Sequence, residues 1–111
     1  MNKGLIAASG DLIGFLNADD FFCRRDAVEL LVKAAGGSNL AAVIGGVSIA
    51  RLSPKVQNIR SYPGAGFARW MLRFGHMPPH PGFYMTCKAR DTVGLFDNSM
   101  HIGGVFEWMV R

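Results

Sequence analysis

The stretch that decides the fold is GDLIGFLNADD, residues 10–20. Its apolar run, Leu12–Leu16, is short and lies between Asp11 and the polar segment Asn17–Asp20. A short apolar run between turn-forming residues is typical of a strand buried on both faces, as in a parallel sheet. We therefore expect a strand over residues 12–16 that carries an acidic pair at its carboxyl end.

Helical and extended patterns alternate on either side of this strand. Apolar residues three and four apart predict a helix from Arg25 or Asp26 to Ala35, ended by Gly36-Gly37. The other expected elements are a helix end over residues 2–8, a strand over 41–52 with a kink or bulge at Gly45-Gly46, its hairpin partner over 56–62, a helical stretch over 67–74, a non-helical proline segment over 77–81, an aromatic strand over 82–87, a helix over 88–93 closed by Gly94, and a helix over 104–111. This order favours an α/β sandwich built around a mixed sheet.

The composition is that of one small folded domain. The chain has 111 residues, of which 50% are hydrophobic, and this size suits a single core. Twelve basic and eight acidic residues give a net charge of +4. The excess suits an anionic ligand such as a diphosphate and equally suits an ordinary surface. No basic stripe is visible, so nucleic-acid binding is not expected.

The two cysteines, Cys23 and Cys87, form no disulfide framework. They lack CxxC spacing and a nearby histidine cluster, which argues against zinc, and we expect both to be buried free thiols in a reducing compartment. The sequence has no signal-peptide pattern, and its apolar runs are too short for a transmembrane segment. These features predict a cytoplasmic protein that reaches a membrane surface only through partners.

Several short motifs occur in a fixed order along the whole chain. They are MNKG at residues 1–4, SGD at 9–11, NADD at 17–20, MPPHP at 77–81, VGLFD at 93–97 and FEWM at 106–109. Together they resemble the family 2 inverting glycosyltransferases, which have a nucleotide-diphospho-sugar transferase fold of the GT-A type. The resemblance implies that residues 1–111 form one domain, a partial GT-A-like α/β unit with a mixed sheet flanked by helices. This unit would correspond to the C-terminal part of such an enzyme, without the amino-terminal portion that grips the nucleotide.

The resemblance also implies a metal site. Asn17-Ala18-Asp19 occupies the place of the family's D-x-D motif, so Asp19 is the first expected ligand of Mg²⁺ or Mn²⁺ and Asp20 the second. The metal would hold the diphosphate of a nucleotide-sugar or nucleoside diphosphate, because hard carboxylate oxygens suit such ions. Asn17 would help to bind this substrate. The alternative reading is that the acidic pair only forms a turn and caps the next helix.

His80 is the second expected substrate-binding residue. It lies between prolines, which would make a rigid mount for a group facing the acceptor or the diphosphate. The alternative is a loop histidine bonded to nearby backbone. The aromatic residues Trp70, Phe74, Phe83 and Tyr84 are expected in the core rather than on a sugar-stacking surface.

The expected catalytic base is absent. Relatives carry an Asp where this chain has Val105, and valine cannot accept the proton of an acceptor hydroxyl. The remaining candidates are Glu107 and Asp97. Glu107 is two positions along the expected helix and points elsewhere, whereas Asp97 is expected to end a turn.

Two functions follow from these observations. The first is a glycosyltransferase-like protein whose ancestral role is metal-assisted sugar transfer from a nucleotide-diphospho-sugar to an acceptor, with weak or absent activity in this chain. The alternative is a non-catalytic, oligomeric binding or assembly domain on the same scaffold. We expect a homo-oligomer, because the strand over residues 12–16 would have an open edge and the helices would have uncovered apolar faces.

Overall fold

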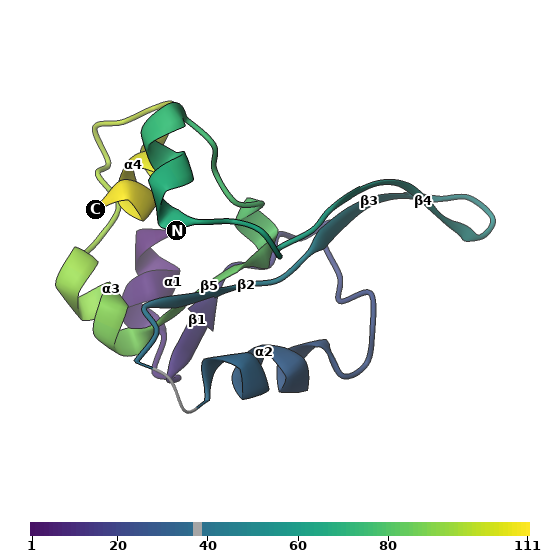
Figure 1. Ribbon diagram of the computed structural model, residues 1–111, viewed down its shortest axis with the longest axis horizontal. Helices are drawn as coiled ribbons and strands as arrows, with labels where there is room; N and C mark the ends of the chain where they lie inside the picture. The colour runs from purple at the N-terminus through teal and green to yellow at the C-terminus, as the bar shows by residue number, and fades with distance from the viewer. Residues whose placement is uncertain (37–38) are drawn as a thin grey trace.

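The computed structural model describes residues 1–36 and 39–111, which form an α/β fold with two antiparallel sheets. Its elements are α1 (Asn2–Ala7), β1 (Leu12–Gly14), α2 (Ala27–Ala35), β2 (Ala42–Ile44), β3 (Val47–Leu52), β4 (Val56–Tyr62), the 3-10 turns η1 (Arg69–Phe74) and η2 (His80–Gly82), β5 (Phe83–Thr86), α3 (Cys87–Val93) and α4 (Gly104–Val110). Figure 1 shows α2 and α4 on opposite sides of β2 and β5.

The first sheet has the strand order β1-β5-β2, and β5 is antiparallel to both neighbours. The prediction of a parallel or mixed sheet is therefore wrong for the described residues, in which every pairing is antiparallel. β1 is also shorter than expected and is not buried on both faces, because Ile13 is buried whereas Gly14 is exposed. It does lie at the edge of its sheet, as expected.

The second sheet is the hairpin β3–β4. The turn Ser53-Pro54-Lys55 joins its strands, which confirms the predicted hairpin. The expected irregularity lies elsewhere: Gly45-Gly46 separates β2 from β3 as the chain passes between the sheets, and the register shift lies between Ile49 and Ala50. Figure 1 shows the hairpin as an arm that projects from the body. The radius of gyration of 14.6 Å exceeds the value of about 13 Å typical of this chain length, which agrees with a projecting arm.

The core is small. Its buried hydrophobic residues among those described are Leu5, Ile13, Met85 and Trp108, which come from α1, β1, β5 and α4. Phe96 stacks on Trp108 with ring centroids 4.3 Å apart, and the indole Nε1 donates a hydrogen bond of 2.8 Å to the Gly94 carbonyl oxygen. Each core residue belongs to a different element, so the core depends on all four being in place.

Side-chain bonds tie α1 to the turn after α3. Asn2 donates from Nδ2 to the Phe96 carbonyl oxygen and accepts from the Phe96 N–H at Oδ1, each at 2.9 Å. Arg90 of α3 donates from Nη1 to the Ala8 carbonyl oxygen at 2.9 Å, just past the end of α1. These bonds satisfy backbone groups that a helix end and a turn leave unpaired.

The helix predictions hold for α1, α2, α3 and α4 within one or two residues. Gly94 closes α3 with φ of 81°, and the Thr86 hydroxyl caps the start of α3 by accepting a bond from Ala89 N–H. α2 ends at Ala35 with Gly36 as its cap, and Gly37 of the predicted stop lies outside the described residues.

Three expectations about burial and local structure fail. Trp70 and Phe74, expected in the core, are 60% and 73% exposed and make an edge-to-face pair on η1. Cys23 is exposed rather than buried. The proline segment over residues 77–81 does include the start of a 3-10 turn, because Pro81 takes an early position where its missing N–H costs nothing.

Among the described residues, the helices are all too short or too polar to span a lipid bilayer.

Candidate functional site

The acidic segment after β1 forms a closed turn. The Asp20 N–H donates to the Asn17 carbonyl oxygen at 3.1 Å, and Asn17 Nδ2 donates to Asp20 Oδ2 at 2.7 Å. The Asn17 N–H reaches the same carboxylate oxygen at 3.3 Å. Asp19 is exposed, in the middle of this turn. Of the two predicted ligands, Asp20 therefore helps to hold the turn, while Asp19 is presented to solvent.

His80 lies next to this turn although it is 60 positions further along the chain. Its ring stacks on Phe15, which follows β1, with centroids 6.2 Å apart. Burial lowers the pKa of His80 below its usual value, and the nearby charge of Asp20 opposes this shift. Burial therefore favours the neutral form of the imidazole. Its Nε2 is buried without a hydrogen-bond partner among the described residues, whereas the alternative reading expected a backbone bond.

Tyr84 is the third member of this group and was not among the predicted site residues. Burial raises the pKa of its phenol, and the charge of Asp20 adds to the effect. Tyr84 is paired with Gly14 of β1, at the end of the strand that leads to the acidic turn. The contact between Gly14 and Tyr84 could have pointed to Tyr84 as a site residue. It could not be predicted, because the sequence does not show that these two strands pair.

The carboxylates of Asp19 and Asp20 suit a metal ion that is also coordinated by the phosphates of a ligand better than an ion that only protein groups coordinate. The described residues contain no group of three or more His, Cys, Asp or Glu side chains placed to hold an ion. Mg²⁺ is commonly held by one or two carboxylates together with substrate phosphates and water. Asp19, with Asp20 beside it, can supply these one or two carboxylates.

The candidate bases lie in other interactions. Glu107 of α4 pairs with Arg111 at 2.7 Å, and its Oε2 is buried without a partner among the described residues. Asp97 accepts two bonds from Ser99, and these bonds lower the pKa of its carboxyl group. A carboxylate with a lowered pKa is a weaker base. Val105 is half-buried on α4, where it offers no proton acceptor.

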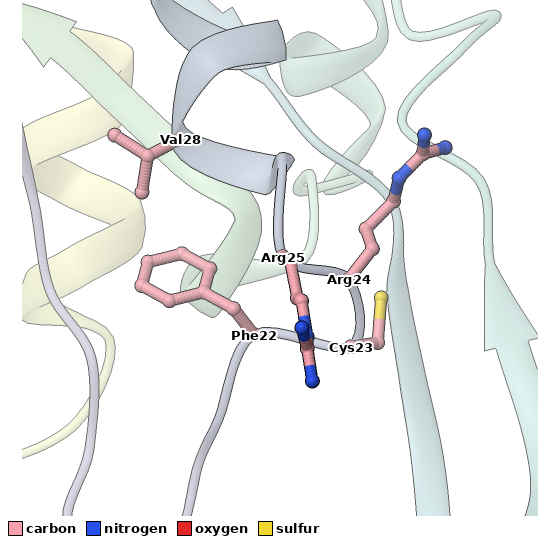
Figure 2. Close-up of a pocket in the computed structure, with 5 residues that line it drawn as sticks. All are labelled: Phe22, Cys23, Arg24, Arg25 and Val28. Atoms are coloured by element: carbon pink, nitrogen blue, oxygen red, sulfur yellow. The ribbon is translucent and has the colours of Figure 1, made fainter.

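Two cavities among the described residues lie away from this turn. One, of about 270 Å³, is lined by Phe22, Cys23, Arg24, Arg25 and Val28. Figure 2 shows the side chains of Arg24 and Arg25 pointing in different directions. Arg24 makes a bidentate pair with Asp26 at 2.6 Å, which lowers the pKa of the Asp26 carboxyl group. Arg25 is therefore the cation of this cavity that can meet an anion.

The larger cavity, of about 500 Å³, lies between the sheet and η1, α3 and α4. Its walls are mainly apolar and include Met85 and Trp108 of the core, with Arg69, Lys88 and Arg111 also among its lining residues. Asn17, Asp19, Asp20 and His80 line neither cavity. Of the predicted substrate and metal residues, Asn17 and Asp19 are exposed, and Asp20 and His80 are half-buried.

Comparison of the chain with protein-family models, with curated proteins and with solved structures gives no match.

Proposed function

We propose that the chain is a glycosyltransferase-like domain that binds a metal-bound diphosphate at the Asn17–Asp20 turn and has little or no transfer activity. The observation that carries the proposal is that the Asn17–Asp20 turn follows the segment on which His80 and Tyr84 pack, His80 against Phe15 and Tyr84 against Gly14. Residues from two distant segments thereby form one polar surface at the end of β1.

The chemistry of this surface suits a nucleotide-sugar or nucleoside diphosphate. Asp19 is free to contact Mg²⁺ or Mn²⁺, and a neutral imidazole such as His80 can donate a hydrogen bond to a phosphate oxygen without needing a proton from solvent. The metal would neutralise the charge of the diphosphate. Asn17 was expected to bind the substrate; its side-chain amide donates to Asp20, so in this proposal it shapes the turn that presents Asp19.

Weak activity is proposed because none of the three positions considered for the catalytic carboxylate supplies one that is free of other interactions. Val105 has no ionisable group, Glu107 is paired with Arg111, and Asp97 is held by Ser99. Inverting transfer needs a base that removes the proton of the acceptor hydroxyl, and such a base contributes about 10²–10⁴-fold to a rate.

Ligand-dependent stabilisation tests the binding part of the proposal. Nucleoside diphosphates with Mn²⁺, at a hundredfold over the dissociation constant, should stabilise the chain by about 2.7 kcal/mol. Asp19→Ala should abolish the shift, and Asp11→Ala, an exposed carboxylate on the other side of β1, should retain it. Absence of a shift with every nucleotide would overturn the proposal, and rapid release of nucleoside diphosphate from sugar nucleotides would overturn its claim of weak activity.

A non-catalytic assembly domain is the second candidate, and the exposed apolar surface favours it. The residues of α2 include no fully buried side chain, and Val28 and Val32 of its apolar stripe are 53% and 55% exposed. Apolar surface of this extent is typical of interfaces. Sedimentation equilibrium tests this function, since a monomer at all micromolar concentrations would contradict it.

A further inference from the structure

The β3–β4 hairpin has one face that is both apolar and cationic. In its register Val47 pairs with Tyr62 and Ile49 pairs with Arg60. Because alternate residues of a strand point to the same side, Arg51 shares this face with Val47 and Ile49. The Arg60 guanidinium lies over the Tyr62 ring at 4.9 Å, and Ile49 is 50% exposed. We call these five residues the arm face.

The opposite face of the hairpin carries three polar residues that bond to one another, together with the apolar residues Ala50 and Val56, and its strand residues carry no charge. The hydroxyls of Ser48 and Ser61 lie 3.0 Å apart, and Asn58 Nδ2 donates to Ser61 Oγ at 2.8 Å. A two-stranded hairpin is marginally stable in water by itself. The arm face differs from this face in combining apolar side chains with the cations Arg51 and Arg60, so it is the side suited to an apolar and acidic partner.

The charge of the chain is unevenly distributed along the sequence. Between Glu29 and Asp91 there is no acidic residue, while the basic residues of this stretch are Lys33, Arg51, Lys55, Arg60, Arg69, Arg73, Lys88 and Arg90. Five of the acidic residues, Asp11, Asp19, Asp20, Asp26 and Glu29, precede the stretch. The hairpin is thus basic throughout, and the segment that leads from β1 to α2 is acidic.

The loop over residues 16–22 matches the arm face in chemistry. Leu16, Phe21 and Phe22 are 49%, 52% and 43% exposed, and they flank the acidic pair of which Asp19 is exposed. We call this segment the acidic loop. It offers apolar groups for Val47, Ile49 and Tyr62, and carboxylates for the two arginines.

We propose that the chain forms a twofold dimer in which the arm face of each copy docks on the acidic loop of the other. The partner is a second copy because one chain carries both complementary surfaces, and two reciprocal contacts close the assembly. Apolar burial supplies most of the affinity, and the exposed charges set the register, since single surface ion pairs contribute little. The proposal specifies the interface of the assembly function proposed above.

Sedimentation equilibrium of the wild-type chain and of charge-reversed variants tests this interface. We expect a wild-type dimer that weakens between about 0.1 M and about 1 M salt, as the Debye length falls from about 10 Å to about 3 Å. R51E/R60E on the arm face and D19K/D20K on the acidic loop should each weaken dimerisation by at least about tenfold, because each sets like charges against each other. D19K alone keeps the turn bond between Asn17 and Asp20 and should act in the same direction.

Mixing the two double variants is the decisive step. In a mixed pair the glutamates of one arm meet the lysines of the other loop, and the unchanged arm meets the unchanged loop, so both contacts are restored. We expect a heterodimer about as tight as the wild-type dimer. R69E/R73E, which reverses two exposed arginines of η1 outside the arm face, should dimerise like the wild type.

The possible outcomes distinguish a wrong interface from a wrong assembly function. A dimer that survives both double reversals, or a mixture that stays monomeric, would overturn the interface and leave assembly through another face. A wild-type monomer at every concentration would overturn both. Nucleotide binding is measured on the monomeric chain, because the docked arm would cover Asp19, which the diphosphate proposal also uses.

Discussion

The ring of Tyr84 lies over Gly14 on the neighbouring strand, in the space that a side chain at position 14 would occupy. A Cβ at Gly14 would collide with the ring atoms, including those nearest the backbone, which cannot move far. The close approach of these two residues joins the end of β1 to β5 beside the acidic turn. It therefore fixes the relation between two parts of the candidate site.

Gly14→Ala should destabilise the chain because the added methyl group overpacks this contact. We expect a loss of about 1–3 kcal/mol in the free energy of unfolding, measured by urea denaturation. In a Tyr84→Ala background the same substitution should cost much less. Gly10→Ala is the control, since its Cβ would meet its nearest neighbour, the Leu12 carbonyl oxygen, at 3.6 Å. Equal losses at positions 10 and 14 would contradict the prediction.

The two tryptophans should differ sharply in their effect on stability. Trp108 is 3% exposed and packs against Phe96, whereas Trp70 is 60% exposed on η1. Trp108→Ala should lower the free energy of unfolding by about 3–5 kcal/mol or abolish folding. Trp70→Ala should change it by about 0.5 kcal/mol or less. Circular dichroism and urea titration measure both, and comparable losses would argue against the observed core.

The half-buried imidazole of His80 should make stability depend on pH. Its pKa is lowered in the folded state, so the unfolded chain binds a proton first as the pH falls through about 6.5. The free energy of unfolding should therefore decrease below that pH, until the lower folded pKa is reached. His80→Gln should flatten this part of the profile, and His101→Gln, at an exposed position, should leave it unchanged. Parallel profiles for the His80→Gln variant and the wild type would exclude this origin.

A carboxylate at position 105 should restore part of the missing base function. Val105→Asp should raise the rate at which nucleoside diphosphate is released from a sugar nucleotide with Mn²⁺, because general bases contribute about 10²–10⁴-fold. Val105→Asn is the matched control, as it has nearly the same shape and accepts no proton. Since Val105 is half-buried on α4, both variants should also lose some stability. Equal rates for the two variants would contradict the prediction.

Local chemistry made most of the elements predictable. Gly94 ends α3 with a positive φ that glycine adopts without strain, and Ser53-Pro54-Lys55 turns the hairpin. Strand direction was not predictable, because the apolar run over residues 12–16 reads alike in parallel and antiparallel sheets. Helical spacing placed Trp70 and Phe74 on one face, but whether other elements cover that face is decided by the whole fold.

The candidate site was also predictable only in part. The turn at Asn17–Asp20 followed from its composition, since Asn and Asp side chains bond to nearby backbone. The association of Asp20 with His80 and Tyr84 depends on β1 pairing with β5, a contact between segments about 70 positions apart. Sequence spacing carries no information on such a pairing.

The wide separation of the core residues has a consequence for synthesis of the chain. Leu5 and Ile13 are synthesised before their core partners Met85 and Trp108, which lie far along the chain. The hydrogen bonds from Asn2 to Phe96 and from Arg90 to Ala8 also cannot form until the later residue of each pair has been synthesised. Until those partners are synthesised, the side chains of Leu5 and Ile13 lack their native contacts, and exposed apolar surface of this kind favours aggregation of a nascent chain.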